Sequence, residues 1–115
     1  MNIVRNDQTT IMHRSVIYNG VVYFGGVVGE DLSKGMYGQT ISITERLDAL
    51  LKAAGTNKTK LLSANIFITD MGLKDDMSKA WTNWIAKDDL PTRATIGVAD
   101  LGPNCLIEVV ITAAV

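Results

Sequence analysis

The sequence has little of the residue types on which metal sites and disulfides depend. Its 115 residues include one cysteine, Cys105, and one histidine, His13. A single cysteine excludes a disulfide within the chain, and this pair is too small a set of soft ligands for a zinc site. We therefore expect no metal site. No motif around either residue supports a Cys/His nucleophilic pair, and the simpler interpretation is that Cys105 is a small apolar residue near a turn.

The sequence also lacks an excess of positive charge and a long apolar run. It has 11 Lys and Arg against 12 Asp and Glu, and the basic residues are scattered. Because nucleic acids and anionic membranes are bound through clustered cations, we expect neither as a partner. No stretch approaches the roughly 20 apolar residues of a membrane span, and "MNIVRNDQTT" lacks the apolar core of a signal peptide. The expected compartment is the cytoplasm.

An Asn-Gly pair, Asn19-Gly20, predicts a β-hairpin near the start of the chain. It joins two short β-like runs, 15–18 and 21–24, and this dipeptide suits a type I′ turn because both central residues need positive φ. Gly25 and Gly26 follow directly. A glycine pair at this place allows either a β-bulge or a close approach of the backbone to a ligand, and the sequence leaves both open.

The first predicted helix ends at Gly55, a residue that favours the left-handed conformation after a helix. Its apolar stripe consists of Ile43, Leu47, Leu50, Leu51 and Ala54. This spacing is that of one face of an α-helix. Ser42 with Glu45 fits a capping box, although the helical pattern also allows a start near Met36 or Gln39.

The second predicted helix follows Thr69 or Asp70 as its cap. Its apolar stripe consists of Met77, Ala80, Trp81, Trp84 and Ile85. We interpret both tryptophans as helix-to-sheet core and not as a platform on which a ligand stacks. Pro91 stops this region of helix.

The remaining strands are predicted at 61–70, 93–100 and 106–114. Together the elements indicate one domain over residues 1–115 of the α+β class, in the order β-β-α-β-α-β-β, with two helices on one face of a mixed sheet. The strand runs at 61–70 and 106–114 carry apolar residues on both faces. Since two helices cover one face only, we expect the other face to be buried against further subunits.

Two charged residues stand inside the last two strands, Arg93 and Glu108. Strand alternation places Arg93 with Thr95 on one face and Glu108 with Thr112 on one face of the next run. If both sets lie on the side away from the helices, Arg93 and Glu108 approach each other at the rim of an intersubunit cleft. The residues alone allow two interpretations, a salt bridge between neighbouring strands and a functional site.

The stretch that holds these two charges, "LPTRATIGVADLGPNCLIEVVITAAV", resembles the signature of the Rid (reactive intermediate deaminase, YjgF-type) family. The signature has a Pro and then an Arg at the start of a strand, a Leu-containing turn, and an apolar-Glu-apolar run at the carboxyl end. The likeness continues through "ERLDALLKAAG", "SANIFITDM" and "MSKAWTNWI" in family order. The last of these, with the ending "ITAAV", is most similar to the YoaB-like subgroup.

The resemblance implies a fold, an assembly and an activity. The protomer would have a chorismate-mutase-like fold and would form a homotrimer, with a cleft at each subunit boundary. The activity would be the hydrolysis of reactive enamines and 2-imino acids, such as 2-aminoacrylate, to 2-keto acids and ammonia. No cofactor or metal is implied, and the partners would be a small carboxylate substrate and further copies of the chain.

The resemblance also implies roles for individual residues. Arg93 would hold the substrate carboxylate through two parallel hydrogen bonds, and Glu108 would position or deprotonate the attacking water. These two are the catalytic candidates. The candidate substrate-binding residues are Arg93, Phe24, Gly25, Gly26, Thr95, Ser78 and His13.

Several of these positions depart from family members with deaminase activity. Their usual Tyr before the first hairpin aligns with Met12 or His13, and their Thr-Ser-Gly is Phe24-Gly25-Gly26 here. Their Asn in the second helix is Ser78, and their Cys two residues after the Arg is Thr95. His13 would then be either a donor to the substrate or a surface residue without a role.

Two other classes of function are alternatives to the deaminase. In the first, a trimer binds small carboxylates such as keto acids without turnover and has a regulatory role, with Arg93 as the anchor and Glu108 as a structural partner. The second is ribonuclease activity. It is not favoured, because the sequence has no basic groove and no aromatic platform flanked by cations.

Overall fold

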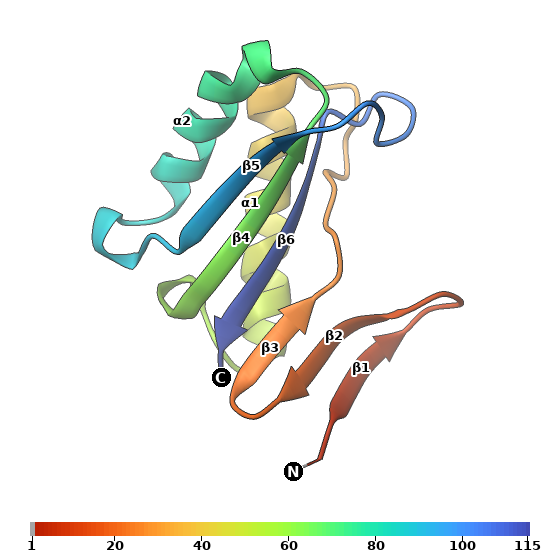
Figure 1. The fold of residues 1–115 in the computed structure, drawn as a ribbon, viewed down its shortest axis with the longest axis vertical. Coiled ribbons are helices and arrows are strands. Elements are labelled where there is room, and N and C mark those ends of the chain that lie inside the picture. The colour runs from red at the N-terminus through yellow and green to blue at the C-terminus, as the bar shows by residue number, and fades with distance from the viewer. Residues whose placement is uncertain (1) are drawn as a thin grey trace.

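The computed structural model describes residues 2–115 and confirms the α+β class, with two helices and a six-stranded mixed sheet (Figure 1). The strands are β1 (Val4–Gln8), β2 (His13–Tyr18), β3 (Val21–Phe24), β4 (Leu61–Ile68), β5 (Thr92–Gly97) and β6 (Ile107–Ala114). The helices are α1 (Met36–Ala53) and α2 (Lys74–Trp84), and three 3₁₀ turns are η1 (Lys58–Lys60), η2 (Met71–Leu73) and η3 (Lys87–Asp89). Along the sheet the order is β1-β2-β3-β6-β4-β5, and only the β4–β5 pair is parallel.

Strand β1 is absent from the sequence-based prediction. Its residues, "VRNDQ", are all exposed, and the strand pairs antiparallel with β2 at the edge of the sheet. A strand that buries no side chain has no apolar alternation, so its only signal is the backbone pairing supplied by β2. The observed order is therefore β-β-β-α-β-α-β-β.

The Asn-Gly hairpin is confirmed. Asn19 and Gly20 both have positive φ, 52° and 78°, and Tyr18 pairs with Val21 across the turn. This geometry matches the type I′ turn that the dipeptide favours.

The start of α1 differs from the capping-box prediction. The N-cap is Gly35, without a side-chain cap, and the helix begins at Met36, seven residues before the stripe at Ile43. The alternative start near Met36 is thereby confirmed. Ser42 instead accepts a hydrogen bond from the backbone N–H of Glu30, at 2.9 Å, and ties the preceding loop to the helix. Neither helix in the described part of the chain is long and apolar enough to cross a membrane.

The cap predicted for the second helix lies one turn earlier than α2 itself. Asp70 accepts a hydrogen bond from the N–H of Gly72 at 2.8 Å and caps η2, which leads directly into α2. The first residue before α2, Leu73, makes no side-chain cap. Asp75 and Asp76 lie in the first turn of α2, where the helix dipole favours negative charge.

The core lies between the two helices and one face of the sheet, because both helices lie on the same side of it (Figure 1). Its strand residues include Val22, Phe24, Ala64, Ile66, Ile68, Ile107, Val109 and Ile111, and its helix residues include Ile43, Leu47, Leu51, Met77 and Trp81. Trp81 is fully buried, as predicted. Trp84 is half-buried at the margin of this core, where its indole N–H donates to Asp48 at 3.1 Å.

The opposite face of the sheet is open to solvent in a single chain. The register places Tyr23 opposite Thr112, and Phe67 opposite Glu108, on this side. Tyr23 is 49% exposed, whereas its neighbours on the helix side, Val22 and Phe24, are buried, and Ile96 on the edge strand is 40% exposed. The apolar residues on both faces of the strands predicted an apolar face of this kind. That further subunits bury this face stays a prediction.

Candidate active site

Arg93 lies on the edge strand β5 and its side chain faces the helix side of the sheet. The parallel register pairs Arg93 with Ala64 and Thr95 with Ile66, whose side chains are in the core. Arg93 donates from Nε to the Thr95 hydroxyl at 3.0 Å and from Nη2 to the Ser78 hydroxyl of α2 at 2.8 Å. Three of the predicted site residues therefore form one cluster between β5 and α2.

The guanidinium of Arg93 is half-buried and has no ion-pair partner within residues 2–115. Burial lowers the pKa of Arg93 below its ordinary value, because desolvation disfavours the charged form. Two of its N–H groups are held by neutral hydroxyls, which orient the planar fork and leave its other donors free. A carboxylate is the ligand that these donors match, since it accepts two parallel hydrogen bonds from a guanidinium.

The Gly25-Gly26 pair forms a β-bulge at the end of β3. Tyr23 pairs with Thr112 and Val27 pairs with Val109, so three residues on one strand oppose two on the other. One extra residue on one strand is the definition of a bulge. One of the two alternatives for this glycine pair is thereby confirmed.

The bulge brings the backbone of Gly26 against the Glu108 side chain. A Cβ atom on Gly26 would overlap Oε2 of Glu108 and lie 2.8 Å from its Cδ, so only glycine leaves room for this carboxylate. Glu108 is half-buried. The N–H of Gly25 donates to the carbonyl of Arg14 at 3.0 Å, whereas within the described residues the N–H of Gly26 has no acceptor. Gly26 thus offers a free donor beside a carboxylate.

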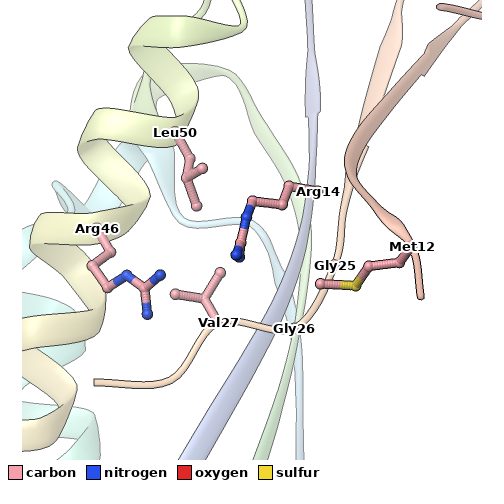
Figure 2. A pocket seen from close by; sticks show the side chains of 7 residues that line it. All are labelled: Met12, Arg14, Gly25, Gly26, Val27, Arg46 and Leu50. Carbon is pink, nitrogen blue, oxygen red and sulfur yellow. The ribbon is translucent and has the colours of Figure 1, made fainter. Parts of the chain in front are cut away.

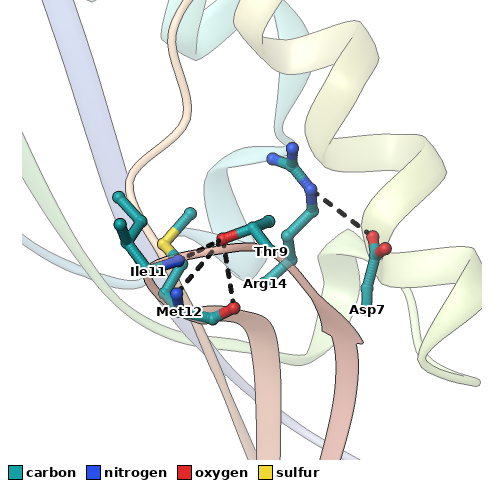
Figure 3. A network of polar contacts seen from close by, with 5 residues as sticks. All are labelled: Asp7, Thr9, Ile11, Met12 and Arg14. Carbon is teal, nitrogen blue, oxygen red and sulfur yellow. Dashed lines mark hydrogen bonds and ion pairs between the residues drawn. The ribbon is translucent and has the colours of Figure 1, made fainter.

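Met12 forms the wall next to Gly25. Thr9 holds the β1–β2 turn closed: its hydroxyl oxygen accepts from the N–H groups of Ile11 and Met12 and donates to the Met12 carbonyl at 3.2 Å (Figure 3). The backbone N–H of Thr9 also donates to this carbonyl, at 2.7 Å. This places Sδ of Met12 3.2 Å from the position of a Cβ on Gly25. Of the two residues that align with the family's Tyr, Met12 therefore occupies the place beside the glycines. His13 faces a separate hollow at the β1–β2 turn, lined by residues 8–13.

Arg93 and Glu108 do not share a face of the sheet, so that part of the prediction is wrong. Arg93 pairs with Ala64 on the helix side, whereas Glu108 pairs with Phe67 on the open side. Strand β4 also separates β5 from β6, so the two residues are not on neighbouring strands. The alternative interpretation, a salt bridge between neighbouring strands, is therefore wrong as well. Within one chain the predicted site is two separate halves, one around Arg93 and one around Glu108.

Comparisons with known proteins bear on what these two halves belong to. The model of the family described as Endoribonuclease L-PSP matches residues 8–115, nearly the whole chain. This chain belongs to the Rid (YjgF-type, endoribonuclease L-PSP) family. A Rid relative from Haemophilus ducreyi, a RutC family protein, is 37% identical over 113 residues, which are 98% of this chain and 97% of the relative. The resemblance inferred from the C-terminal signature is thereby confirmed.

The Rid assignment holds at the level of subgroup and fold. The RutC family protein YoaB of Escherichia coli is 35% identical over 115 residues and both chains are covered completely. The crystal structure of a YjgF-family protein from Neisseria meningitidis superposes with a TM-score of 0.93 at 29% identity, covering 99% of this chain and 95% of that one. The predicted α+β fold with two helices on a mixed sheet is therefore that of the Rid family.

Of the residues singled out in the sequence, the substrate-binding candidate Phe24 and the lone cysteine, Cys105, are both buried. The side chain of Phe24 is 5% exposed and packs in the core, so the prediction that it contacts the substrate does not fit its position. Cys105 is buried in the β5–β6 connection, where its N–H donates to the carbonyl of Gly102, in agreement with a small apolar residue near a turn. Within residues 2–115 no group of three His, Cys, Asp or Glu side chains is placed to hold a metal ion.

Sequence reasoning missed two arginines near the Rid glycine pair. Arg14 of β2 and Arg46 of α1 line a hollow together with Gly25 and Gly26 (Figure 2). A signal for Arg46 exists in the sequence, since it stands three residues after Ile43 and four before Leu50, on the edge of the apolar stripe of α1. For Arg14 no such signal exists, because its approach to α1 depends on how the β1–β2–β3 strands pack.

Proposed function

We propose that this protein hydrolyses reactive 2-imino acids and their enamine tautomers, such as 2-aminoacrylate, to 2-keto acids and ammonia. The observation that carries the proposal is the half-buried guanidinium of Arg93, which is oriented by Ser78 and Thr95 and has no carboxylate partner in the described chain. A buried cation that lacks a partner is costly unless a ligand anion supplies one. Every 2-imino acid carries such an anion next to its reactive carbon.

The proposed site is completed by a second copy of the chain, in a homotrimer. Arg93 is on the edge strand β5 with its side chain on the helix side, and Glu108 is on the open face of β6, so we infer that the two halves meet between copies. Both surfaces that this arrangement requires are free in one chain: the outer edge of β5, and the apolar face that includes Tyr23 and Ile96. A threefold arrangement would give three equal sites, each with Arg93 from one copy and Glu108 from the next.

The chemistry requires one carboxylate anchor and one base. Arg93 would hold the substrate carboxylate, and the free N–H of Gly26 would point at the same ligand. Glu108 would take a proton from water as the water oxygen forms a bond to the imine carbon. That proton passes to the nitrogen and gives a carbinolamine. The proton of its hydroxyl group then moves to the nitrogen as the carbon–nitrogen bond breaks, so ammonia leaves and the carbinol oxygen becomes the keto oxygen. No electron is transferred, so the reaction balances without an oxidant or reductant.

The test is whether the purified protein accelerates keto-acid formation from imino acids that an amino-acid oxidase generates in the same cuvette. Alanine, leucine and glutamate as oxidase substrates sample small, apolar and acidic side chains. We expect a rate above the spontaneous one for at least one of them, proportional to protein concentration. No acceleration across the panel would contradict the proposal. Saturable keto-acid binding without turnover would assign the protein to the class of non-catalytic carboxylate binders.

Gly26→Ala is expected to lower kcat by about 10- to 100-fold with little loss of folding, because the new Cβ displaces the Glu108 carboxylate. Gly25→Ala is the matched control. Its Cβ is tightest against the flexible end of Met12, with Sδ at 3.2 Å and Cε at 3.4 Å, and lies at ordinary contact distance, 3.9 Å, from the Arg14 carbonyl, so we expect a small effect. Steady-state kinetics and thermal melts of both variants measure this. Equal activity of the two variants would show that the position of Glu108 does not matter.

A further inference from the structure

Arg14 and Arg46 come from different elements and point into the same narrow hollow. Arg14 extends from β2 toward α1, and Arg46 extends from α1 toward the bulge, with Val27 between them and Leu50 alongside (Figure 2). Met12, Gly25 and Gly26 complete the walls. Neither Arg93 nor Glu108 lines this hollow, although Gly25 and Gly26 border both it and the Glu108 half of the proposed active site.

Each arginine has one ion-pair partner, and neither partner lines the hollow. Arg46 donates from Nη1 to the backbone carbonyl of Val28 at 2.7 Å, which fixes its direction. Its nearest carboxylate, Glu30, is 4.0 Å away, and the carboxylate of Asp7 is 3.6 Å from Nε of Arg14 (Figure 3). These distances exceed that of a hydrogen bond, and the two acidic side chains are 66% and 77% exposed. Such outer ion pairs are weak and leave guanidinium donors free.

The chemistry of the hollow selects a small oxyanion. Two guanidiniums that line one hollow repel each other, and an anion between them removes this repulsion and accepts charge-assisted hydrogen bonds from both. The apolar side chains of Val27 and Leu50 exclude water from one side, which strengthens such bonds. The enclosed part of the hollow has room for about one water molecule, so one oxygen of an oxyanion fits there and the rest of the ligand lies at the mouth. The chain's net charge of -1 gives no general attraction for anions, so binding here would depend on this arginine pair.

We propose that Arg14 and Arg46 form a second anion site, which binds a small oxyanion, either inorganic phosphate or the terminal carboxylate of an organic acid. The proposal uses contacts within one chain. It therefore does not depend on the deaminase activity or on the assembly of the active site.

The test is a titration of the ¹⁵N-labelled protein with inorganic phosphate and, separately, with acetate, at constant ionic strength. We expect saturable shifts of the Gly25 and Gly26 amide signals for at least one anion, and the anion that saturates identifies the source of the oxyanion. Arg14→Gln and Arg46→Gln are each expected to weaken the Kd by about tenfold or more. Arg5→Gln, which removes an exposed arginine of β1 and the same charge, is the matched control and should leave the Kd unchanged.

The same titration of Arg93→Ala separates this site from the proposed active site. Retained binding in Arg93→Ala supports the second site even if no imino acid is hydrolysed. Loss of binding in Arg93→Ala, equal binding by the Arg14→Gln/Arg46→Gln double variant, or no saturation by either anion up to about 50 mM would each overturn the proposal.

Discussion

Arg93→Ala is expected to lower kcat/KM for 2-imino acids by about 10²–10⁴-fold, because it removes two charge-assisted hydrogen bonds to the substrate carboxylate. The fold should survive, since the side chain contacts only the hydroxyls of Ser78 and Thr95 and is half-buried. Keto-acid production and circular dichroism of the purified variant measure the two effects. Binding of a keto-acid product should weaken in parallel, because the product keeps the carboxylate.

Two controls distinguish anchoring from a general effect of charge. Arg93→Lys keeps the charge but loses the planar fork, so we expect an intermediate activity. Arg5→Ala removes an exposed arginine on β1 and should leave kcat/KM unchanged. Full activity of Arg93→Ala would show that the carboxylate is held elsewhere.

Glu108→Gln is expected to lower kcat by about 10²–10⁴-fold with little change in the binding of a keto acid. The amide has nearly the same shape and still fits over Gly26, but it cannot take a proton from water. Glu45→Gln, at an exposed position on α1, is the matched control. The measurement is kcat at saturating imino acid together with the Kd of a keto acid.

The result for Glu108→Gln decides whether Glu108 acts as the catalytic base. Loss of turnover with retained binding assigns Glu108 the role of base. A variant as active as the wild type would remove Glu108 from the mechanism and would leave Gly26 and water to do the chemistry.

Much of the fold could be predicted from the sequence because its elements bury regular stripes of apolar side chains. The stripe from Ile43 to Leu51 and the Asn19-Gly20 turn both lead to the observed elements. Strand β1 could not be found in this way, since all of its residues are exposed and its pairing with β2 is its only cause. The capping box at Ser42 failed because Gly35 starts the helix without any side-chain cap.

The candidate site residues could be identified from the sequence, but not their arrangement. Alternation correctly placed Arg93 and Thr95 on one face of β5, and Glu108 and Thr112 on one face of β6. Which face each set occupies depends on the register with β4, a long-range pairing that neither strand's sequence contains. The choice of Met12 over His13 likewise depends on the turn that Thr9 closes.

In the proposed trimer, each active site takes Arg93 from one copy and Glu108 from another. The most direct test mixes Arg93→Ala with Glu108→Gln by co-expression under two different tags, isolates the oligomers that carry both, and assays them against each parent. Neither parent has a complete site, but each isolated mixed trimer has one site of three with both Arg93 and Glu108 intact, so it should regain about one third of wild-type activity. Mixed oligomers as inactive as their parents would contradict the shared site.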